Sequence, residues 1–478
     1  MDATLERWLR DGAGDGHRCE RLIETPISWV FLYADRALKL KKPVDFGFLD
    51  FTSLDKRRWA AERELEFNRA TAPDLYRAVH AVVRRPGGAL ALGGDGEIVE
   101  WALEMARFDE TAVLAEQPGV VAGDFAEALG RQVARMHLGA PAGSRGGGAA
   151  GLRYVADSNA SHLRHLADRL GSQAVERLIA DTEAAILARA GLLDERAGQG
   201  LARCCHGDLH LGNIVLREGR PVPFDCIEFN DALSEIDVLY DLAFLLMDLG
   251  FRGQAEGANR VLNGWLDQAA RGFSGLWSGL ACLGLFQSVR AGVRAHVSGH
   301  AGDFATARRY LAAAQAHLEA PAPRLTAVGG LSGSGKSTFA RALAPSMAPP
   351  PGAVVLRSDE IRKRLWRRSP TEQLPPDAYT KEMSARVYAE MLKAARACLA
   401  AGWPVILDAV FLRQSERTAV EALAARARVG FEGVWLQADP GVMRARVATR
   451  RGDASDADVQ VLELQLSQHP GEIAWTLR

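Results

Sequence analysis

The feature that most constrains this chain is the stretch GLSGSGKS at residues 330–337, in which four residues separate the first glycine from Gly-Lys-Ser. An apolar run, LTAVG, leads into it, and a helical pattern, STFARALA, follows. Glycines let backbone N–H groups curl around phosphate oxygens, and the helix that follows directs its positive dipole end at the same anion. The stretch therefore predicts a phosphate-binding strand–loop–helix unit.

The surrounding segment, residues 325–478, alternates strand and helix patterns. Its apolar strands are RLTAVGG, VVLRSD, PVILDAV and GVWLQAD, with IAWTLR as the expected last strand. Helical stretches separate them, which is typical of a parallel sheet covered by helices. The segment is therefore predicted to be an α/β domain built on the phosphate loop.

Within this domain we assign the nucleotide contacts to the loop and the start of its helix. Lys336 would bridge the outer phosphates, and the Ser337 hydroxyl would ligate Mg²⁺. Asp359 follows the second strand and could accept a substrate hydroxyl proton or position Mg²⁺. Asp408 closes the strand PVILD, where a Mg²⁺–water ligand is expected, although either aspartate could instead cap a helix. The predicted nucleotide-binding residues here are Gly330, Ser332, Gly333, Ser334, Gly335, Lys336, Ser337, Thr338 and Arg450.

Arginines near the C-terminus suggest a lid. Arg446, Arg450 and Arg451 are expected on successive helical turns, where they could neutralise a transferring phosphate or simply face solvent. We predict catalytic roles for Arg446 and Arg450. A basic cluster at 362–368 could bind an anionic substrate or be an exposed helix face, with Arg362 as the best candidate. The segment resembles the small-molecule P-loop kinases, namely gluconate, shikimate and adenylate kinases and the zeta toxins.

A second motif, HGDLHLGNIVLREGRPVPFDCIEF, occupies residues 206–229. It places an aspartate and an asparagine five residues apart and a further aspartate a dozen residues later, which is a layout used for phosphoryl transfer. Asp208 would accept the proton of a substrate hydroxyl. Asn213 and Asp225 would hold Mg²⁺ against the phosphates of ATP, and His206 would brace the loop.

This motif closely resembles that of the aminoglycoside phosphotransferase and choline kinase group, over about residues 20–320. The resemblance implies the bilobal α+β fold of protein kinases. It also implies a phosphate-contacting lysine, Lys39 or Lys41, paired with Glu64 or Glu62, and an adenine-binding hinge near Glu104–Met105. The glycine-rich loop that would precede the lysine is absent from the stretch ETPISWVFL.

The chain is predicted to have three parts. Residues 1–118 form the small lobe, with a β-hairpin at 27–42 and a helix at 53–72. Residues 119–320 form a mainly helical large lobe that carries the catalytic loop, with a glycine-rich loop at 139–151. A proline-containing linker, EAPAPR, leads to the α/β domain at 325–478.

Composition excludes several classes. Fifty-eight basic and 59 acidic residues give 478 residues a net charge of −1, so a global polybasic surface for nucleic acid or lipid is excluded. No apolar run approaches the length of a membrane span, and the N-terminus does not resemble a secretory signal. Six cysteines are too few for a disulfide scaffold, and we expect free thiols in a reducing cytoplasm.

The pairing of the two motifs resembles a bacterial group in which an aminoglycoside phosphotransferase-like domain is fused to an ATP-binding domain. The resemblance implies a bifunctional, ATP- and Mg²⁺-dependent phosphotransferase whose partners are small-molecule hydroxyl acceptors such as sugars or aminocyclitols. Two alternatives stay open. One half could be a nucleotide-binding module that gates the other, or the C-terminal half could be a zeta toxin-like kinase of nucleotide sugars.

Overall fold

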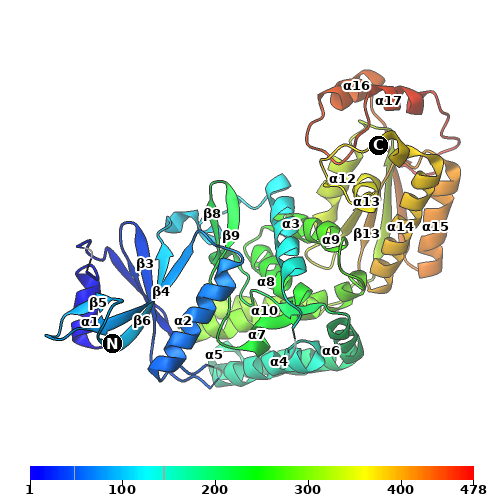
Figure 1. Ribbon diagram of the computed structural model, residues 1–478. Helices are drawn as coiled ribbons and strands as arrows, with labels where there is room; N and C mark the ends of the chain where they lie inside the picture. The colour runs from blue at the N-terminus through cyan, green and yellow to red at the C-terminus, as the bar shows by residue number, and fades with distance from the viewer. Residues whose placement is uncertain (15, 48, 144–145) are drawn as a thin grey trace. The chain divides into compact units, whose positions relative to one another are not determined.

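A computed structural model of the chain describes residues 1–14, 16–47, 49–143 and 146–478 (Figure 1). These residues form two compact units, each assembled from several stretches of chain. The first comprises residues 1–120, 141–147 and 202–236, and the second comprises residues 121–140, 148–201 and 237–478. The stretch that carries the predicted catalytic loop thus groups with the N-terminal sheet, and the predicted domain boundaries remain predictions.

The first unit is built on a six-stranded antiparallel sheet in the order β1-β2-β3-β6-β4-β5. The hairpin predicted at 27–42 is confirmed as β2–β3, with Val30 opposite Lys39. The predicted helix at 53–72 is α2, which begins after Ser53, whose hydroxyl accepts a hydrogen bond from the Lys56 amide. The elements are α1 (Ala3–Arg10), β1 (Arg21–Glu24), β2 (Ser28–Leu32), β3 (Arg36–Lys41), α2 (Leu54–Arg69), β4 (Tyr76–Arg84), β5 (Leu90–Leu92) and β6 (Glu97–Ala106).

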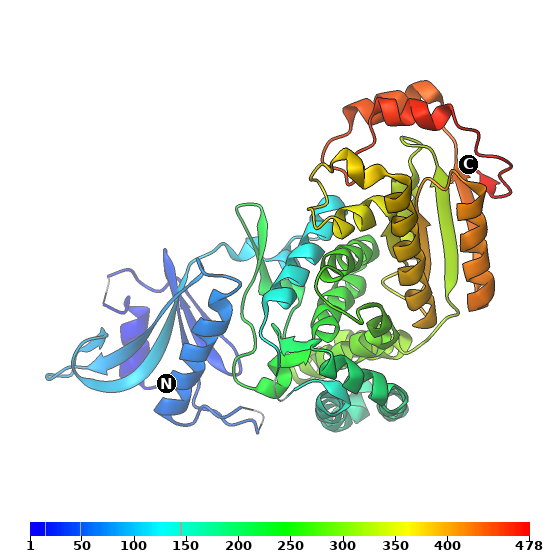
Figure 2. The ribbon, with the colours of Figure 1, turned by 45° about the vertical axis from the view of Figure 1, so that its right-hand side comes forward.

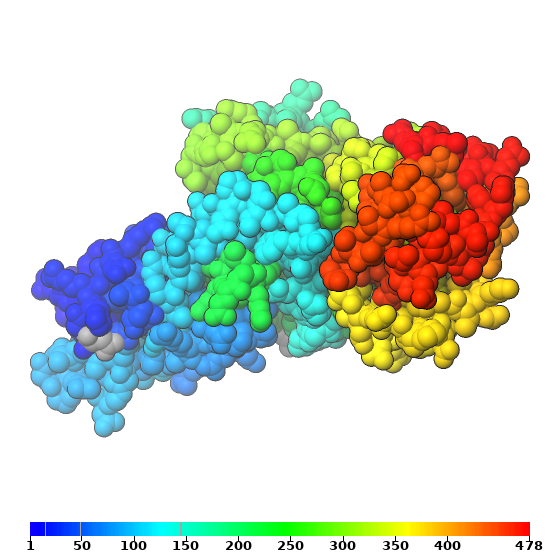
Figure 3. All heavy atoms as spheres, turned by 90° about the horizontal axis from the view of Figure 1, so that it is seen from above, coloured from blue at the N-terminus to red at the C-terminus, as the bar shows by residue number. Residues whose placement is uncertain are grey.

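The stretch 202–236 completes this unit. Its hairpin pairs β8 with β9, and Val215 of β8 bridges to Val113. In Figure 3 the hairpin, coloured green, lies at the surface beside cyan residues of the N-terminal stretch. Phe224 packs into the apolar cluster under the sheet, so the catalytic loop is anchored to the strands that carry Lys39. The elements are β7 (Ala202–Cys204), β8 (Ile214–Arg217), β9 (Arg220–Pro223), α7 (Asp231–Ser234) and β10 (Glu235–Asp237).

The second unit begins with a helical bundle. Its core gathers Leu163, Phe244, Ala295 and Tyr310 from four helices. Buried polar pairs lock the bundle, among them Arg196 with Asp237, at 2.7 Å. The helices are α3 (Gly123–Gly139), α4 (Gly148–His165), α5 (Ala167–Leu170), α6 (Ser172–Gly198), α8 (Val238–Phe251), α9 (Ala255–Ala269), α10 (Leu280–His300) and α11 (Phe304–His317).

The same unit contains the predicted α/β domain, which is confirmed. Its five strands are parallel, in the order β12-β13-β11-β14-β15. Right-handed crossovers place α12 on one face and α14 and α15 on the other, and Figure 2 shows α14 and α15 side by side against the sheet. The elements are β11 (Arg324–Gly330), α12 (Lys336–Leu343), β12 (Val354–Arg357), α13 (Ser358–Leu365), α14 (Lys381–Ala400), β13 (Val405–Asp408), α15 (Gln414–Ala427), β14 (Gly430–Leu436), α16 (Pro440–Thr449), α17 (Val459–Leu466) and β15 (Thr476–Leu477).

Connecting segments differ from the prediction in detail. The glycine-rich loop predicted at 139–151 is shorter, because α4 already begins at Gly148, and its residues 144–145 lie outside the described residues. The linker at 319–324 lies between α11 and β11, as predicted. The six cysteines are free thiols. Among the described residues, no helix combines the length and apolar character needed to cross a bilayer.

Candidate active sites

The first candidate site is centred on Lys39, in the middle strand region of the antiparallel sheet. Its ammonium nitrogen lies 2.8 Å from Glu64 Oε1 on α2 and 2.5 Å from Asp225 Oδ1 at the end of the catalytic stretch. Glu64 is fully buried. The three residues that the resemblance implied, a lysine, a helix glutamate and a metal-binding aspartate, are therefore brought into direct contact.

Lys41 belongs to the same cluster but has other partners. It contacts Glu64 Oε2 at 2.7 Å and Glu228, so the two lysines share one carboxylate. Glu62, the alternative to Glu64, instead pairs with Arg58 on the exposed side of α2. Of the two lysines, Lys39 is the one that forms an ion pair with Asp225, which favours Lys39 over Lys41 as the phosphate-contacting lysine.

Burial and charge act against each other in this cluster. Burial by itself would lower the pKa of Lys39, but Asp225, Glu64 and Glu228 outweigh it and raise that pKa. Burial would likewise raise the pKa of Asp225, yet Lys39 lowers it below its usual range. Lys39 is thus held as a cation and Asp225 as an anion, the states that phosphate and Mg²⁺ binding require.

The catalytic loop is held by its own side chains. The side-chain nitrogen of Asn213, Nδ2, donates to Asp208 Oδ2 and to the Asp208 backbone carbonyl, each at 3.0 Å. His206 Nδ1 lies 3.3 Å from the Asp208 amide, which donates to it, so Nε2 carries the proton and donates to the Phe224 carbonyl at 2.9 Å. His206 therefore ties the loop to the strand end before Asp225, which is the bracing role predicted for it.

Asp225 adopts an uncommon backbone conformation. Its φ of 62° lies in the left-handed region, which a non-glycine residue enters only at a cost of about 1 kcal/mol. Two side chains hold the turn, since the Asp225 amide donates to Tyr76 Oη at 3.0 Å and the Cys226 amide donates to Asn68 Oδ1 at 3.1 Å. The turn aims the Asp225 carboxylate back at Lys39.

The residues predicted to lie near the adenine-binding hinge are at the end of a strand. Glu104 and Met105 are inside β6, where both pair with neighbouring strands on either side. The Glu104 carboxylate is held by Arg77 and His80, and Met105 is part of the apolar core. Because β6 ends at Ala106, backbone groups free of the sheet ladder begin only after that residue.

The second candidate site is the phosphate loop between β11 and α12. Gly333 has a φ of 83°, and a Cβ there would lie 2.7 Å from the Met443 carbonyl, so only glycine fits. Lys336 folds back over the loop and donates to the Leu331 carbonyl at 2.9 Å. Ser334 Oγ is buried without a hydrogen-bond partner among the described residues. These are the features of a loop shaped to receive an anion.

Both predicted carboxylates line a cavity of about 540 Å³ beside this loop. Asp408 Oδ2 accepts a hydrogen bond from Ser337 Oγ at 2.6 Å, which joins the two predicted Mg²⁺-binding groups. Burial raises the pKa of Asp359, and Asp408 adds to this effect while Arg357 opposes it. Burial also lowers the pKa of Lys336 against the pull of Asp408. A carboxyl with a raised pKa in a cleft is suited to proton transfer.

The lid segment, residues 440–470, packs directly on the phosphate loop, where Met443, Val447 and Leu462 gather around Leu331. Figure 3 shows this segment at the surface, in orange to red. Arg446 donates to the Gly333 carbonyl at 3.2 Å, and Gln465 accepts from the Ser332 amide at 2.8 Å. The prediction that Arg446, Arg450 and Arg451 lie on successive helical turns is wrong in part, because α16 ends at Thr449 and Arg450 is its cap. Arg450 still lines the cavity, and its Nη1 is buried with no hydrogen-bond partner in the described chain.

The basic cluster at 362–368 is mostly structural. Lys363 is buried and pairs with Asp456 at 2.6 Å, Arg364 pairs with Asp267, and Arg368 pairs with Glu372. Arg362 alone of the five lines the cavity, where it lies over the Tyr379 ring. It is therefore the one member of the cluster positioned to meet a substrate there.

Sequence reasoning missed Arg357, the last residue of β12. Its guanidinium lies 3.2 Å from Ser337 Oγ, 3.3 Å from Asp408 Oδ2 and 3.0 Å from Asp453 Oδ1. Burial by itself would lower the pKa of Arg357, but the carboxylates of Glu360, Asp408 and Asp453 outweigh it and raise that pKa. The sequence did offer a signal for Arg357, since this arginine ends an apolar strand just before Asp359, a candidate catalytic residue.

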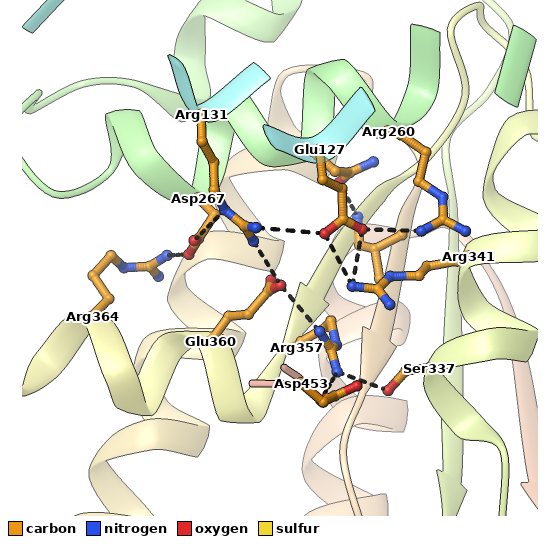
Figure 4. A network of polar contacts seen from close by, with 12 residues as sticks. Glu127, Arg131, Arg260, Asp267, Ser337, Arg341, Arg357, Glu360, Arg364 and Asp453 are labelled. Atoms are coloured by element: carbon orange, nitrogen blue, oxygen red, sulfur yellow. Dashed lines mark hydrogen bonds and ion pairs between the residues drawn. The ribbon is translucent and has the colours of Figure 1, made fainter. Parts of the chain in front are cut away.

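Arg357 also belongs to a network of polar contacts that extends from the α/β domain to α3 of the helical bundle (Figure 4). Glu360 Oε1 lies 3.2 Å from Arg357 Nη1 and 3.2 Å from Arg131 Nη2 on α3. Glu127, one turn before Arg131, pairs at 2.9 Å with Arg341 of α12. The helix that contains Lys336 and the strand that ends at Arg357 are therefore both attached to α3 of the bundle.

Comparison with known proteins shows which family this chain belongs to. "Uncharacterized protein Rv2004c" of Mycobacterium tuberculosis (strain ATCC 25618 / H37Rv) is 32% identical over 456 residues, which cover 92% of this chain and 88% of that protein. The family model "Phosphotransferase enzyme family" matches residues 53–277, and the model "AAA domain" matches residues 325–470. The chain belongs to the family that fuses these two domains.

Solved structures resemble the two parts of this fused phosphotransferase separately. A gluconokinase from Sinorhizobium meliloti covers 33% of this chain and 82% of its own, at 24% identity and a TM-score of 0.22. A choline kinase from Cryptosporidium parvum covers 62% of this chain and 87% of its own, at 10% identity and a TM-score of 0.41. Membership of a phosphotransferase family supports ATP-dependent small-molecule kinase chemistry and leaves the acceptor to be identified.

Proposed function

We propose that this protein is a bifunctional kinase, in which each half transfers the γ-phosphate of Mg·ATP to a hydroxyl of a small molecule such as a sugar or aminocyclitol. One observation carries the proposal: in each half, side chains of the types used in phosphoryl transfer are in direct contact. In the first set Lys39 contacts Glu64 and Asp225, and in the second Ser337 contacts Asp408. A half that had become a passive module would have no need to keep these contacts.

In the N-terminal half, Asp208 is the base that accepts the proton of the acceptor hydroxyl. Asn213 holds it through a hydrogen bond of 3.0 Å, so the carboxylate is oriented before the acceptor arrives. Lys39 contacts the phosphates, and Glu64 fixes its position. The oxygen of Asn213 and the carboxylate of Asp225 form a hard, oxygen-only donor set that suits Mg²⁺.

In the C-terminal half, Asp359 is the base and the phosphate loop binds ATP. The unpartnered Ser334 hydroxyl and Arg450 Nη1 fit an anion, and Ser337 and Asp408 would hold Mg²⁺ directly or through water. Bound Mg²⁺ neutralises charge on the outer phosphates. Arg446 and Arg450, on the lid segment, neutralise the charge of the phosphoryl group in flight.

The decisive experiment measures ADP release with a panel of sugars, polyols, aminoglycosides and nucleotide sugars. The enzymes compared are the wild type, Asp208→Ala, Lys336→Ala and the double variant. Matched controls are Asp95→Ala and Lys393→Ala, which change exposed residues of the same types. We expect one set of acceptors to depend on Asp208 and another on Lys336, with both lost in the double variant. Unchanged turnover in all three active-site variants would refute the proposal.

A second candidate function is gating of one half by the other. The specific observation behind it is a hydrogen bond from Arg357 to Ser337, continued by ion pairs from Arg357 to Glu360 and from Glu360 to Arg131 on α3. In this case a single acceptor would lose phosphorylation in both Asp208→Ala and Lys336→Ala. Transfer to nucleotide sugars alone, dependent on Lys336, would identify the C-terminal half as a zeta toxin-like kinase.

A further inference from the structure

Three histidines converge on the helical bundle, and neither candidate active site uses them. His162 lies in the last turn of α4, and His296 and His300 lie one turn apart near the end of α10. One ring nitrogen from each lies within 4.8 Å of the other two. His162 and His296 are half-buried and His300 is exposed, so the cluster is open to solvent on one side.

The spacing of the rings fits a shared ligand. His162 Nδ1 lies 3.2 Å from His300 Nε2. Two imidazole nitrogens bound to one tetrahedral Zn²⁺ lie about 3.3 Å apart, since each Zn–N bond is about 2.0–2.1 Å long. The rings of His162 and His296 stack with centroids 4.7 Å apart and an interplanar angle of 19°, so one of the two rings must turn before its nitrogen can point at the same ion.

The two helices are fixed on both sides of the cluster. Before it, the Asn159 side chain donates to the Val289 carbonyl at 2.9 Å. A Cβ on Gly292 would lie 3.0 Å from the same amide nitrogen, and a Cβ on Gly299, the neighbour of His300, would lie 2.6 Å from the Leu166 side chain. The side chains of Asn159 and Leu166 thus pack closely against the glycines of α10, which holds the three rings near one another before any ligand binds.

The surroundings of the three imidazoles favour their neutral form. Burial, together with the neighbouring His162 and His300, lowers the pKa of His296 to about 3. Burial and His300 lower the pKa of His162 as well. Among the described residues, no carboxylate forms an ion pair with any of the three. Neutral imidazoles are the form that binds transition metals, and a bound ion would replace the hydrogen bond between His162 Nδ1 and His300 Nε2.

We propose that His162, His296 and His300 form a binding site for one transition-metal ion, with Zn²⁺ as the expected occupant. Three imidazoles suit Zn²⁺ and its neighbours in the first transition row far better than Mg²⁺ or Ca²⁺, which take oxygen ligands. Bound metal would cross-link α4 to α10, and its remaining coordination position would face solvent. The site would bind metal whether or not either half is a kinase.

The test is a Zn²⁺ titration of chelator-treated, full-length protein, followed by calorimetry. Millimolar Mg²⁺ in the buffer occupies the oxygen-rich sites, so that only nitrogen sites report. We expect one Zn²⁺ per chain, and a dissociation constant that rises more than about tenfold in His296→Ala and in His300→Ala. His469→Ala removes an exposed histidine elsewhere in the same unit and should bind as the wild type does.

A second readout separates ligation from folding. Zn²⁺ should raise the melting temperature of the wild type and of His469→Ala but not that of His300→Ala, whose exposed side chain can be removed without opening the core. Co²⁺ should give the visible absorption of a nitrogen-ligated ion in the wild type and in His469→Ala, but not in His296→Ala or His300→Ala. Absence of Zn²⁺ binding, or equal affinity in wild type, His296→Ala and His300→Ala, would overturn the proposal.

Discussion

At the scale of single residues, the sequence motifs identified most of the candidate chemistry. Asp208, Asn213 and Asp225 were visible because they lie close together in the chain, as were Lys336 and Ser337. The choice between Lys39 and Lys41 was open, because alternate residues of a strand lie on one face and both lysines therefore reach the same carboxylate. Contact with Asp225, 186 residues further on, distinguishes them, and local sequence carries no trace of that contact.

The two lysines should respond differently to substitution. In a Lys336→Ala background, Lys39→Ala should lower acceptor-dependent ATP turnover by on the order of a hundredfold, since it removes a cation from the phosphates. Lys41→Ala should act mainly on stability, because it leaves Glu228 and Glu64 buried with one cation fewer. Steady-state kinetics and thermal melts of the two variants provide the comparison. The reverse pattern would assign the phosphate contact to Lys41.

Asp359 should impose a pH dependence on the C-terminal half. A base works only when it is deprotonated, and burial raises the pKa of Asp359 above the ordinary value of 3.8. Turnover should therefore be constant at higher pH and fall as pH drops through that raised pKa, earlier than for an exposed aspartate.

The profile is measured in the Asp208→Ala background, with the acceptor that the panel identifies for this half. Asp359→Asn should lose about a hundredfold or more in kcat and its remaining activity should lack the acid limb. An acid limb that persists in Asp359→Asn would show that another group titrates.

At the scale of elements, alternation of strand and helix patterns gave the α/β domain correctly, and the β2–β3 hairpin and α2 were also predicted. Element ends were less certain. The helix expected to carry three arginines ends at Thr449. This error has a physical cause: where an element stops depends on what its last backbone groups bond, and those partners can come from distant parts of the chain.

The phosphate loop offers a clean test of geometry. Gly333→Ala should abolish nucleotide binding by the C-terminal half, because a Cβ there meets the Met443 carbonyl at 2.7 Å and displaces either the loop or the lid segment. Gly402→Ala is the matched control, since Gly402 has a similar φ of 77° with open space around it. Both variants carry left-handed strain of about 1 kcal/mol, so only the clash differs. Equal ATP affinity in the two variants, measured by calorimetry, would contradict this account.

At the scale of the whole molecule, the sequence predicted two motifs joined by a linker and gave no sign of how far the α/β domain depends on the helical bundle. The ion pairs from α3 to α12 and α13 join residues that lie more than two hundred positions apart, such as Arg131 and Glu360. Arginines and glutamates on helix surfaces look alike whether they face solvent or each other. Only the fold distinguishes them, which is why this interface escaped prediction.

The network should contribute to stability as a unit. Glu360→Gln removes the anion between Arg131 and Arg357, two largely buried cations, and should lower the free energy of unfolding by about 3 kcal/mol. Glu372→Gln breaks the exposed pair with Arg368 and should cost less than about 1 kcal/mol. Urea denaturation of both variants measures the difference, and similar losses would mean that the network contributes no more than a surface pair.

Asn259 and Asn263 of α9 bind one edge of the parallel sheet. Their amides donate to the Ala353 carbonyl, and Asn263 also accepts from the amide of Val355 in β12, the outermost strand of the parallel sheet. A gene that encoded only residues 325–478 would produce a sheet whose bare edge could pair with other chains and whose arginines had lost their anions. The α/β domain should therefore be less soluble as a separate polypeptide than as a part of the full chain.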